Sequence, residues 1–270
     1  MGTTTQRTGS HTVLTELSGG VFTIRLNRPD KLNALDAETC RALVHALLRA
    51  ADDKSVHVIM ITGQGRAFCA GGDLDRIRDA RNRRATAEFQ SMLVSGKELC
   101  LAIASMPKLV VAAVNGPAAG AGMSIALACD LRVASDSAIF TQSFTGVGLY
   151  PDFGATFFLP RLVGLSRASE LFYTAEKLSA EDAHRIGIVY EVYPHEIFAE
   201  KVLELGQHLA AGPPIAYRDI KRTMIGERHK ELEDALDEEI RLQTHCFLSE
   251  DCAEGLKAFF EKRPPKFRGA

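Results

Sequence analysis

The chain has 270 residues, of which 46% are hydrophobic, and its formal net charge is -2 with a pI near 6.5. This length and apolar content suffice for one large domain, or for one domain with an appended helical part. The balanced charge excludes a broad basic surface, so composition predicts neither a nucleic-acid-binding protein nor one that binds anionic membranes.

Cysteine usage and the opening residues predict the compartment. The cysteines form no CxxC pair and have no histidine at ligand spacing, which argues against a zinc site and a disulfide framework. They are Cys40, Cys69, Cys100, Cys129, Cys246 and Cys252. The opening segment 1–12 is polar, and no apolar run approaches the roughly 20 residues that span a bilayer. We expect a reduced, soluble, cytoplasmic protein without a bound metal.

The first half of the chain reads as strands alternating with helices. Short β-like runs from about Thr12 to Leu26, broken by Gly19 and Gly20, predict a hairpin. Asp36 is expected to cap a helix that ends near Ala51. Apolar runs then predict buried strands, with a charged helix after the first and a helix over about 121–128 after the second. These strands are Val56–Thr62, Leu109–Val114 and Leu131–Ser135.

The arginine-rich stretch after the first buried strand, residues 76–84, is interspersed with acidic residues. This pattern favours a solvated helix face and leaves a local anion contact open. The segment from about Ile77 to Leu93 is expected as a loop that folds over the ligand pocket and sets its shape.

The last third of the sequence is helical throughout. Helices are predicted at about 195–210, 213–225, 230–248 and 250–262, with Ser249 as the cap of the last one. We therefore divide the chain into a core over 1–195 and a C-terminal helical region over 196–270. The apolar face of Leu232, Leu236 and Ile240 is expected to cover the core, a partner subunit, or both.

Two strand-to-helix loops are rich in small residues: Gly63–Asp73 and Asn115–Ser124. Glycine lets backbone N–H groups approach a ligand, and the helix N-terminus behind each loop favours negative charge. A GxGxxG dinucleotide motif fails at Phe68 in the first loop and at Ile125 in the second, and no GxxxxGK[ST] exists. These loops therefore predict an anion or developing-charge site that is not a nucleotide site.

Several motifs, taken together and in order, resemble those of the crotonase superfamily, the enoyl-CoA hydratase and isomerase group. The resemblance runs from about residue 12 to residue 267. The motifs are LNRPDKLNALD (26–36), GRAFCAGGDL (65–74), AAVNGPAAGAG (112–122), ALACDLRVAS (126–135), GLYPDFG (148–154) and EGLKAFFEKRPPKF (254–267).

The resemblance implies an α/β fold: a crotonase-like spiral of ββα units with a C-terminal helical oligomerisation region. It implies an acyl-CoA thioester as the ligand, coenzyme A only as part of the substrate, and no other cofactor. It also implies a role in lipid or fatty acid metabolism and assembly as a homotrimer or a dimer of trimers.

Carried over by motif, the backbone N–H groups of Gly72 and Ala121 are the donors that would hold the thioester oxygen as it gains charge. The resemblance also implies contacts with the coenzyme A or acyl parts of the substrate. The residues implied are Arg28, Lys31, Leu32, Ala70, Gly71, Asp73, Leu74, Ser124, Phe144, Tyr150, Phe259 and Lys262. Lys262 is expected to reach the ligand of its own or of a neighbouring subunit.

Two departures from the family pattern concern hydration. Hydratases of the family carry a glutamate at each of two positions, which here hold Ser124 and Phe144. Two carboxylates are needed there to hold and activate the water that adds to the double bond. We therefore expect hydration to be inefficient.

Asp152 remains as the only candidate proton-transfer group, at the position where isomerases of the family carry their single carboxylate. One carboxylate is sufficient to move a double bond while the amide donors hold the dienolate. An apolar acyl pocket is expected to raise the pKa of Asp152. Its predicted lining is Phe144, Leu149, Tyr150, Phe153, Phe157 and Phe158. An alternative role for Asp152 is to cap the helix that starts near Phe153.

The predicted activity is therefore acyl-CoA isomerisation, as a Δ3 to Δ2 enoyl-CoA shift or a phenylacetate-type ring isomerisation. Two alternatives stay open: a hydratase with atypical water activation, and a non-catalytic acyl-CoA-binding trimer. Aryl-CoA dehalogenation is disfavoured because the chain has no tryptophan and no histidine between His57 and His184.

Overall fold

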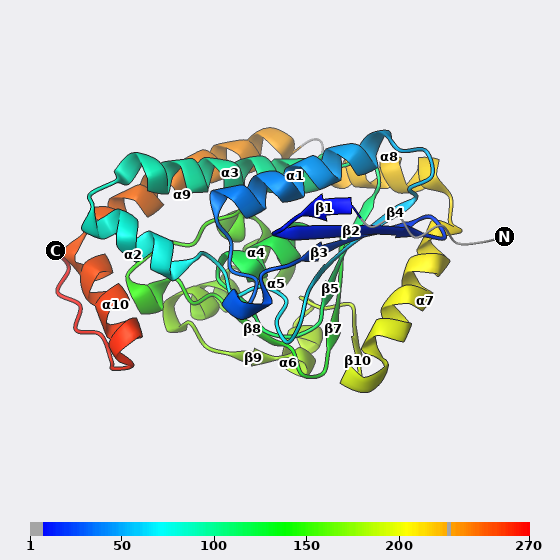
Figure 1. Cartoon of the computed structure of the whole chain (residues 1–270). Helices are drawn as coiled ribbons and strands as arrows, with labels where there is room; N and C mark the ends of the chain where they lie inside the picture. The colour runs from blue at the N-terminus through cyan, green and yellow to red at the C-terminus, as the bar shows by residue number, and fades with distance from the viewer. Residues whose placement is uncertain (1–7, 226–227) are drawn as a thin grey trace.

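The computed structural model describes residues 8–225 and 228–270, so residues 1–7 of the polar opening segment lie outside the described part. Two sheets form the centre of the fold (Figure 1). The larger sheet has the strand order β1-β2-β3-β4-β5-β7-β10, and the smaller has the order β6-β8-β9. The strands are β1 (Thr8–Ser10), β2 (Val13–Ser18), β3 (Val21–Leu26), β4 (Val58–Gly63), β5 (Leu109–Val114), β6 (Ala118–Ala119), β7 (Leu131–Ser135), β8 (Ile139–Thr141), β9 (Leu178–Ser179) and β10 (Glu191–Tyr193).

The centre of the large sheet is parallel and covered on both faces. β3, β4, β5 and β7 pair in parallel, and every residue of β4 is buried. Such continuous apolar strands are typical of parallel sheets that helices cover from both sides. β2 and β3 form an antiparallel hairpin that turns at Gly19 and Gly20, both with positive φ. The predicted hairpin and the predicted buried strands are confirmed.

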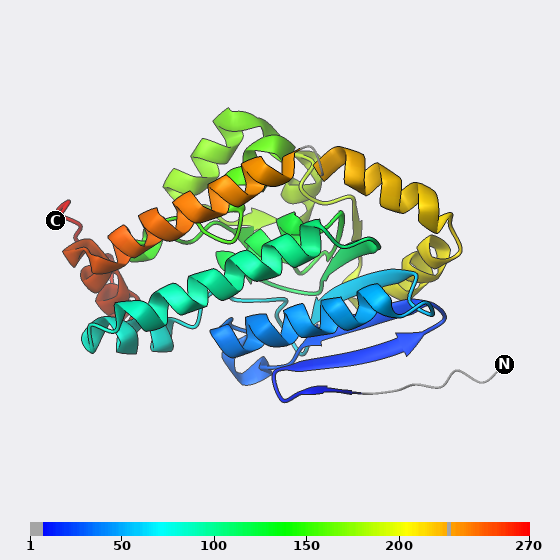
Figure 2. The ribbon, with the colours of Figure 1, turned by 90° about the horizontal axis from the view of Figure 1, so that it is seen from above.

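Helices cover the two faces of this sheet. α1, α3 and α9 lie on one side, with α9 running beside α3 (Figure 2), and α7 packs against β3, β4 and β7. The helices are α1 (Ala37–Asp52), α2 (Leu74–Asn82), α3 (Thr86–Ala104), α4 (Ala121–Ala128), α5 (Ala155–Thr174), α6 (Ala180–Arg185), α7 (Phe198–Ala210), α8 (Pro214–Ile225), α9 (His229–Leu248) and α10 (Glu250–Glu261). Three short 3-10 turns are η1 (Pro29–Lys31), η2 (Thr145–Val147) and η3 (His195–Ile197).

Two predicted helix caps are present. The Asp36 carboxylate accepts from the Thr39 N–H at 2.8 Å, and the Ser249 hydroxyl accepts from the Cys252 N–H at 3.1 Å. The prediction of a loop over about 77–93 is wrong, because these residues belong to α2 and α3. One face of α3, which includes Phe89, Met92 and Leu93, is buried against the rest of the protein, and this packing stabilises the helix.

Two arginines in and after α2 form surface ion pairs, as expected of a solvated helix face, whereas Arg81 is mostly buried against α10. Arg78 lies 3.1 Å from the Asp75 carboxylate, and Arg83, just past the helix, lies 2.8 Å from Glu88. The Arg81 guanidinium donates to the Ser249 carbonyl at 2.6 Å, which joins α2 to the start of α10. Three of the five arginines in residues 76–84 therefore have partners within the protein, and these contacts need no bound anion.

The C-terminal helices cover the chain's own core. Leu232 and Leu236 of α9 belong to the largest hydrophobic cluster, which we call the main core, and Ile240 packs against a second cluster. Of the two expected roles for this face, covering the core is therefore confirmed. Within 8–225 and 228–270, no helix combines the length and apolar character needed to cross a membrane.

A buried ion pair fixes α8 to the sheet. The Lys221 ammonium donates to the Asp130 carboxylate at 2.7 Å and to the Ile103 carbonyl at 2.8 Å. Burial raises the pKa of the Asp130 carboxyl, while Lys221 and the Val110 N–H oppose that rise. Removing the lysine leaves a carboxylate without its counter-charge in a desolvated place.

Lys221→Met should therefore lower the free energy of unfolding by about 3 kcal/mol, the usual cost of breaking a buried pair from one side. Denaturant titration measures this loss. Lys230→Met, at an exposed position of α9, is the matched control and should stay within about 0.5 kcal/mol of wild type. Equal losses in the two variants would contradict the role given to Lys221.

Candidate active site

The first glycine-rich loop lies against the LNRPDKLNALD segment. The Leu35 N–H donates to the Gly71 carbonyl at 2.7 Å, and the Asp73 N–H donates to the Leu35 carbonyl at 2.8 Å. Gly72 lies between these two bonds. Among the hydrogen bonds of the described residues, its N–H has no protein acceptor.

The second loop lies directly beside the first. The Ala119 N–H donates to the Cys69 carbonyl at 3.0 Å, so the two loops are joined through their backbones. Gly71 has φ +91°, and a Cβ built there would lie 2.7 Å from the Ala119 carbonyl oxygen and 3.4 Å from the Ala121 nitrogen. Only glycine fits such a close approach.

Ala121 is the first residue of α4, a position whose N–H has no partner within the helix. In the described part of the chain no hydrogen bond uses this N–H. The two amides that the sequence singled out, those of Gly72 and Ala121, therefore lie on adjacent loops and are both available. Two such donors stabilise an oxygen that gains negative charge.

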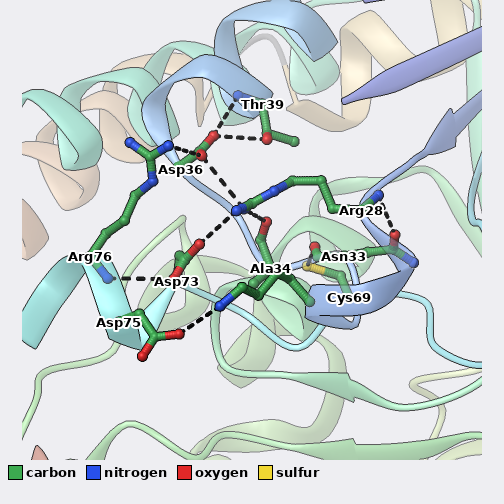
Figure 3. A network of polar contacts seen from close by, with 10 residues as sticks. Arg28, Asn33, Ala34, Asp36, Thr39, Cys69, Asp73, Asp75 and Arg76 are labelled. Atoms are coloured by element: carbon green, nitrogen blue, oxygen red, sulfur yellow. Dashed lines mark hydrogen bonds and ion pairs between the residues drawn. The ribbon is translucent and has the colours of Figure 1, made fainter. Parts of the chain in front are cut away.

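Arg28 connects the segment before α1 to the end of the first glycine-rich loop (Figure 3). Its guanidinium donates to the Ala34 carbonyl at 2.6 Å and to the Asp73 carboxylate at 2.7 Å, and it lies 3.5 Å from the Asp36 carboxylate. The Arg76 guanidinium lies 3.2 Å from the same Asp36 carboxylate and forms a second ion pair with it. The network holds Asp73, next to Gly72, at the start of α2. These neighbours hold the Arg28 guanidinium, and its expected contact with coenzyme A stays a prediction.

Burial by itself would raise the pKa of Asp36. Hydrogen bonds from the Thr39 N–H and hydroxyl, with the charges of Arg28 and Arg76, hold that pKa below its ordinary value instead. Asp36 therefore stays ionised and completes the network.

The other predicted coenzyme A contacts gather at the rim of the first loop. Lys31 pairs with Asp75 at 2.7 Å, with both side chains about half-exposed, and the Ala70 N–H donates to the Leu32 carbonyl. Leu74 is the first residue of α2.

The end of α10 lies near the same rim. Arg78 of α2 lies 3.8 Å above the ring of Phe260, and the neighbouring Phe259 is about half-exposed. Lys262 is the C-cap of α10, in the left-handed conformation. The structure thus brings α10 to α2 within one chain.

A second hydrophobic cluster, which we call the acyl-side cluster, lies between these loops and the C-terminal helices. Its buried members are Ile77, Ala80, Phe89, Met92, Leu93, Phe144, Val147, Leu149, Phe247, Cys252 and Leu256. A Cβ built on Gly72 would lie 3.1 Å from Ile77 and 4.0 Å from Met92, and one built on Gly120 would lie 3.6 Å from the Phe144 ring. The cluster therefore borders both amide donors.

The predicted pocket lining divides between the two clusters. Phe144 and Leu149 belong to the acyl-side cluster, whereas Phe153, Phe157 and Phe158 belong to the main core, which also contains Ala121; their place in the pocket lining stays a prediction. The Phe153 ring lies against Gly96 of α3. Tyr150 is half-buried, and burial raises the pKa of its hydroxyl.

Asp152 is buried, and its two carboxyl oxygens have different surroundings. Oδ2 accepts a hydrogen bond from the Gln243 side-chain amide at 3.0 Å, whereas Oδ1 is buried with no partner among the described residues. Burial raises the pKa of Asp152 to about 8; the Gln243 hydrogen bond opposes the rise, and the charge of Glu239 adds to it. A carboxyl with such a pKa is protonated at neutral pH and becomes an effective base once ionised.

A chain of contacts relates Asp152 to the loops. Val147 and Leu149 donate their N–H groups to the Phe144 carbonyl, so a tight turn leads from the ring beside Gly120 towards Asp152.

The alternative role of Asp152 as a helix cap is wrong. α5 begins at Ala155, whose N–H donates to the backbone carbonyl of Asp152 at 3.2 Å, but the Asp152 side chain makes no capping hydrogen bond; the carboxylate at this end of the helix is that of Glu239 of α9. The Glu239 carboxylate accepts from the Gly154 N–H at 2.8 Å and from the Thr156 N–H at 3.0 Å. The Asp152 side chain is thus left free of a capping role.

Glu239 and Gln243 were missed from the sequence, and Asp152 is not the only buried carboxyl in this region. Burial raises the pKa of Glu239 to about 7, against the hydrogen bonds from Thr156 and Gly154. A signal existed, since Glu239 and Gln243 follow Leu232 and Leu236 at helical spacing on the apolar face of α9. Polar residues on such a face need partners in the interior.

The six cysteines are free, and the described residues contain no group of three or more His, Cys, Asp or Glu side chains that could hold a metal ion. The candidate site therefore consists of two backbone amides, an apolar cluster, and a buried aspartic acid held by α9.

The spiral of strand, loop and helix, with a second small sheet and C-terminal helices, is the crotonase fold. The chain belongs to the enoyl-CoA hydratase/isomerase family, whose model matches residues 16–270. The protein is accordingly an enzyme of this family that acts on acyl-CoA.

Its relatives have mixed activities. The chain is 42% identical to a probable enoyl-CoA hydratase of Rhodobacter capsulatus, over 96% of this chain and 98% of the relative. It is 37% identical to the 1,2-epoxyphenylacetyl-CoA isomerase of Escherichia coli, over 95% of this chain and 98% of that relative. Among solved structures, an enoyl-CoA hydratase from Mycobacterium avium subsp. paratuberculosis is 36% identical, with a TM-score of 0.86 over 95% of this chain and 98% of that one.

The raised pKa of Asp152 predicts a pH-dependent stability difference between wild type and Asp152→Asn. The carboxyl ionises near 3.8 in the unfolded chain and near 8 in the folded one. The folded state therefore binds more protons between these values, and wild-type stability falls as the pH rises through this range. Asparagine cannot ionise, so the variant avoids that loss.

Near pH 4 the free energy of unfolding of Asp152→Asn should equal that of wild type. At pH 8 it should exceed the wild-type value by about 2 kcal/mol or more, as measured by denaturant unfolding. Asp234→Asn, at an exposed position of α9, serves as the control and should show no such trend. A difference between Asp152→Asn and wild type that stays constant from about pH 4 to pH 8 would show that Asp152 is not desolvated.

Proposed function

We propose that the protein is an enoyl-CoA isomerase that moves a double bond through an oxyanion-stabilised dienolate, with Asp152 as the proton shuttle. The observation that carries the proposal is a buried carboxyl with one hydrogen-bonded oxygen and one oxygen without a partner among the described residues, three residues after Leu149 of the cluster that borders Gly72 and Ala121. One such carboxyl is sufficient as the acid-base group for a Δ3 to Δ2 shift of the double bond or for a phenylacetate-type ring isomerisation.

The reaction we propose has two proton transfers. The thioester oxygen accepts hydrogen bonds from the N–H groups of Gly72 and Ala121. Ionised Asp152 removes a proton from C2 of a 3-enoyl-CoA, and the electron pair of that C–H bond delocalises over the diene to the thioester oxygen. Protonated Asp152 then returns the proton to C4, which leaves the double bond between C2 and C3 and regenerates the carboxylate.

The surroundings of the two positions at which hydratases of the family carry glutamates support isomerisation over hydration. Ser124 is fully buried, and its hydroxyl donates to the carbonyl of Gly120, the N-cap of α4, at 3.1 Å. Phe144 is buried, and its ring lies close to Gly120. Neither side chain offers a carboxylate to a water, so addition of water lacks its usual base.

For the coenzyme A part we propose contacts at the rim of the first loop and at the end of α10. The groups involved are Arg28, Lys31, Leu32, Ala70, Gly71, Asp73, Leu74, Phe259 and Lys262. The closeness of α2 and α10 within the chain supports this arrangement. For the acyl part we propose contacts with Ser124, Phe144 and Tyr150, and we propose a homotrimer or a dimer of trimers.

Hydration is the second candidate, and two observations favour it. The Rhodobacter capsulatus relative is named a probable enoyl-CoA hydratase, and Glu239 supplies a second buried carboxyl near Asp152. Against this, both Glu239 oxygens already accept hydrogen bonds, from Gly154 and Thr156. A carboxylate occupied in this way is poorly placed to activate water.

The test supplies a 3-enoyl-CoA and a 2-enoyl-CoA separately to wild type and to Asp152→Asn. Wild type should isomerise the first and hydrate the second slowly. Asp152→Asn should lose isomerisation by at least about 100-fold, the lower end of what a general acid-base contributes. Asp234→Asn is the matched control and should retain wild-type activity.

Rapid hydration by wild type would overturn the isomerase assignment in favour of the hydratase. Undiminished isomerisation by Asp152→Asn would remove Asp152 from the mechanism. Binding of both thioesters without turnover would favour the remaining alternative, a non-catalytic acyl-CoA-binding trimer.

The pH profile gives an independent prediction. Asp152 must be ionised to remove the first proton, and its pKa is near 8. The kcat/KM for 3-enoyl-CoA isomerisation should therefore rise about tenfold per pH unit below pH 8 and level off above it. Initial rates from about pH 6 to pH 9.5 measure this, and a profile already flat at pH 6 would contradict a desolvated base.

A further inference from the structure

One side chain of α9, Gln243, joins the candidate acid-base group to its own backbone. Its Nε2 donates to Asp152 Oδ2 at 3.0 Å, and its Oε1 accepts from the Tyr150 N–H at 2.8 Å. Gln243 is 1% exposed. The amide therefore bridges Asp152 and the residue two positions before it, inside the protein.

These two partners determine the orientation of the Gln243 side-chain amide, that is, which end is the oxygen and which is the NH₂ group. A backbone N–H can only donate, so the group that faces Tyr150 must be the carbonyl oxygen of Gln243. The NH₂ group of Gln243 then faces Asp152, whatever the protonation state of the acid. Since an NH₂ group only donates, Asp152 Oδ2 must accept and cannot carry the proton towards it.

In a neutral carboxylic acid the carbonyl oxygen is the stronger acceptor, so the hydrogen bond from Gln243 favours Oδ2 as the carbonyl and Oδ1 as the oxygen that carries the proton. This oxygen is buried and has no partner in the described part of the chain. Without the amide, the two oxygens would exchange easily, because the carboxyl torsion of aspartate is broad and nearly two-fold.

The turn that carries Asp152 is held at its other end by the same helix. Glu239, one turn before Gln243 on α9, accepts from the N–H groups of Gly154 and Thr156. Phe153 has φ +57°, a conformation that side chains rarely adopt, and its ring fits only because Gly96 has no Cβ. α9 thus fixes the backbone on both sides of Asp152.

We propose that Gln243 is a positioning residue that acts through Asp152: its amide holds Oδ2 and so dedicates Oδ1 to both proton transfers. This inference rests on the proposed function of Asp152 as the proton shuttle. Gln243 itself touches neither the substrate nor the reacting atoms. Its hydrogen bond also stabilises the ionised form of Asp152, which is the form that acts as the base.

The experiment compares Gln243→Met with wild type, with Asp152→Asn measured alongside. Methionine keeps the length of the side chain and removes both the donor and the acceptor. The kcat for 3-enoyl-CoA isomerisation should fall about 10- to 100-fold, the equivalent of one hydrogen bond to a charged group. KM should stay within about twofold, and the apparent pKa of the kcat/KM profile should rise by about one.

Two further variants complete the design. Gln207→Met, at an exposed position of α7, is the matched control and should leave kcat and the pH profile unchanged. Gln243→Glu keeps an acceptor for the Tyr150 N–H but places a second carboxyl against Asp152. It should raise the apparent pKa further than Gln243→Met does, and it carries the test if the methionine variant fails to fold.

The outcomes separate this inference from the proposed function. If Asp152→Asn isomerises like wild type, the proposed function fails and the role of Gln243 fails with it. If Asp152→Asn is inactive while Gln243→Met or Gln243→Glu keeps the wild-type kcat and pH profile, the positioning role alone is overturned. A kcat loss accompanied by a lower melting temperature and an unshifted pH profile would also overturn it, because a merely structural residue behaves in that way.

Discussion

A carboxyl group kept out of water is the constraint on which the site depends. Ionised Asp152 is disfavoured by its burial and by the neighbouring Glu239, and the one hydrogen bond from Gln243 relieves this only in part. The fold tolerates the cost because the surrounding apolar clusters keep the carboxyl buried and the hydrogen-bonded corner over 154–156 keeps the turn in place. The chemical result is a carboxyl of raised pKa, the property that the proposed base requires.

The amide donors depend on a different set of forces. Two strand-loop-helix units place Gly72 and Ala121 on adjacent loops, and glycine at position 71 permits the close approach. The Arg28 network with Asp36 and Asp73 then fixes the first loop to the segment before α1. Backbone donors held in this way need little rearrangement when charge develops on a bound oxygen.

Regular patterns in the sequence predict much of this fold. The parallel strands, α4 and the caps at Asp36 and Ser249 follow from apolar runs and local capping chemistry, and the structure confirms them. α3 was missed because its buried face is stabilised by packing against α1 and α9, which no local signal reports. The family motifs identify the loops, since these are continuous in sequence.

The surroundings of Asp152 could not be predicted in the same way. Glu239 and Gln243 are about 90 residues further along the chain, and their role depends on how α9 packs against the turn over 150–156. Phe153 shows this: it has a positive φ, and its ring packs against Gly96 within the main core. Local composition does not determine which way such a turn faces.

Transfer of an isotopic label tests the central claim most directly. A 3-enoyl-CoA deuterated at C2 is converted in ordinary water, and the product is analysed by mass spectrometry and NMR. If one buried carboxyl carries the proton between the two carbons, part of the deuterium should appear at C4 of the 2-enoyl-CoA. A product without deuterium at C4, or one with a hydroxyl group from water at C3, would contradict a one-base shuttle in a dry site.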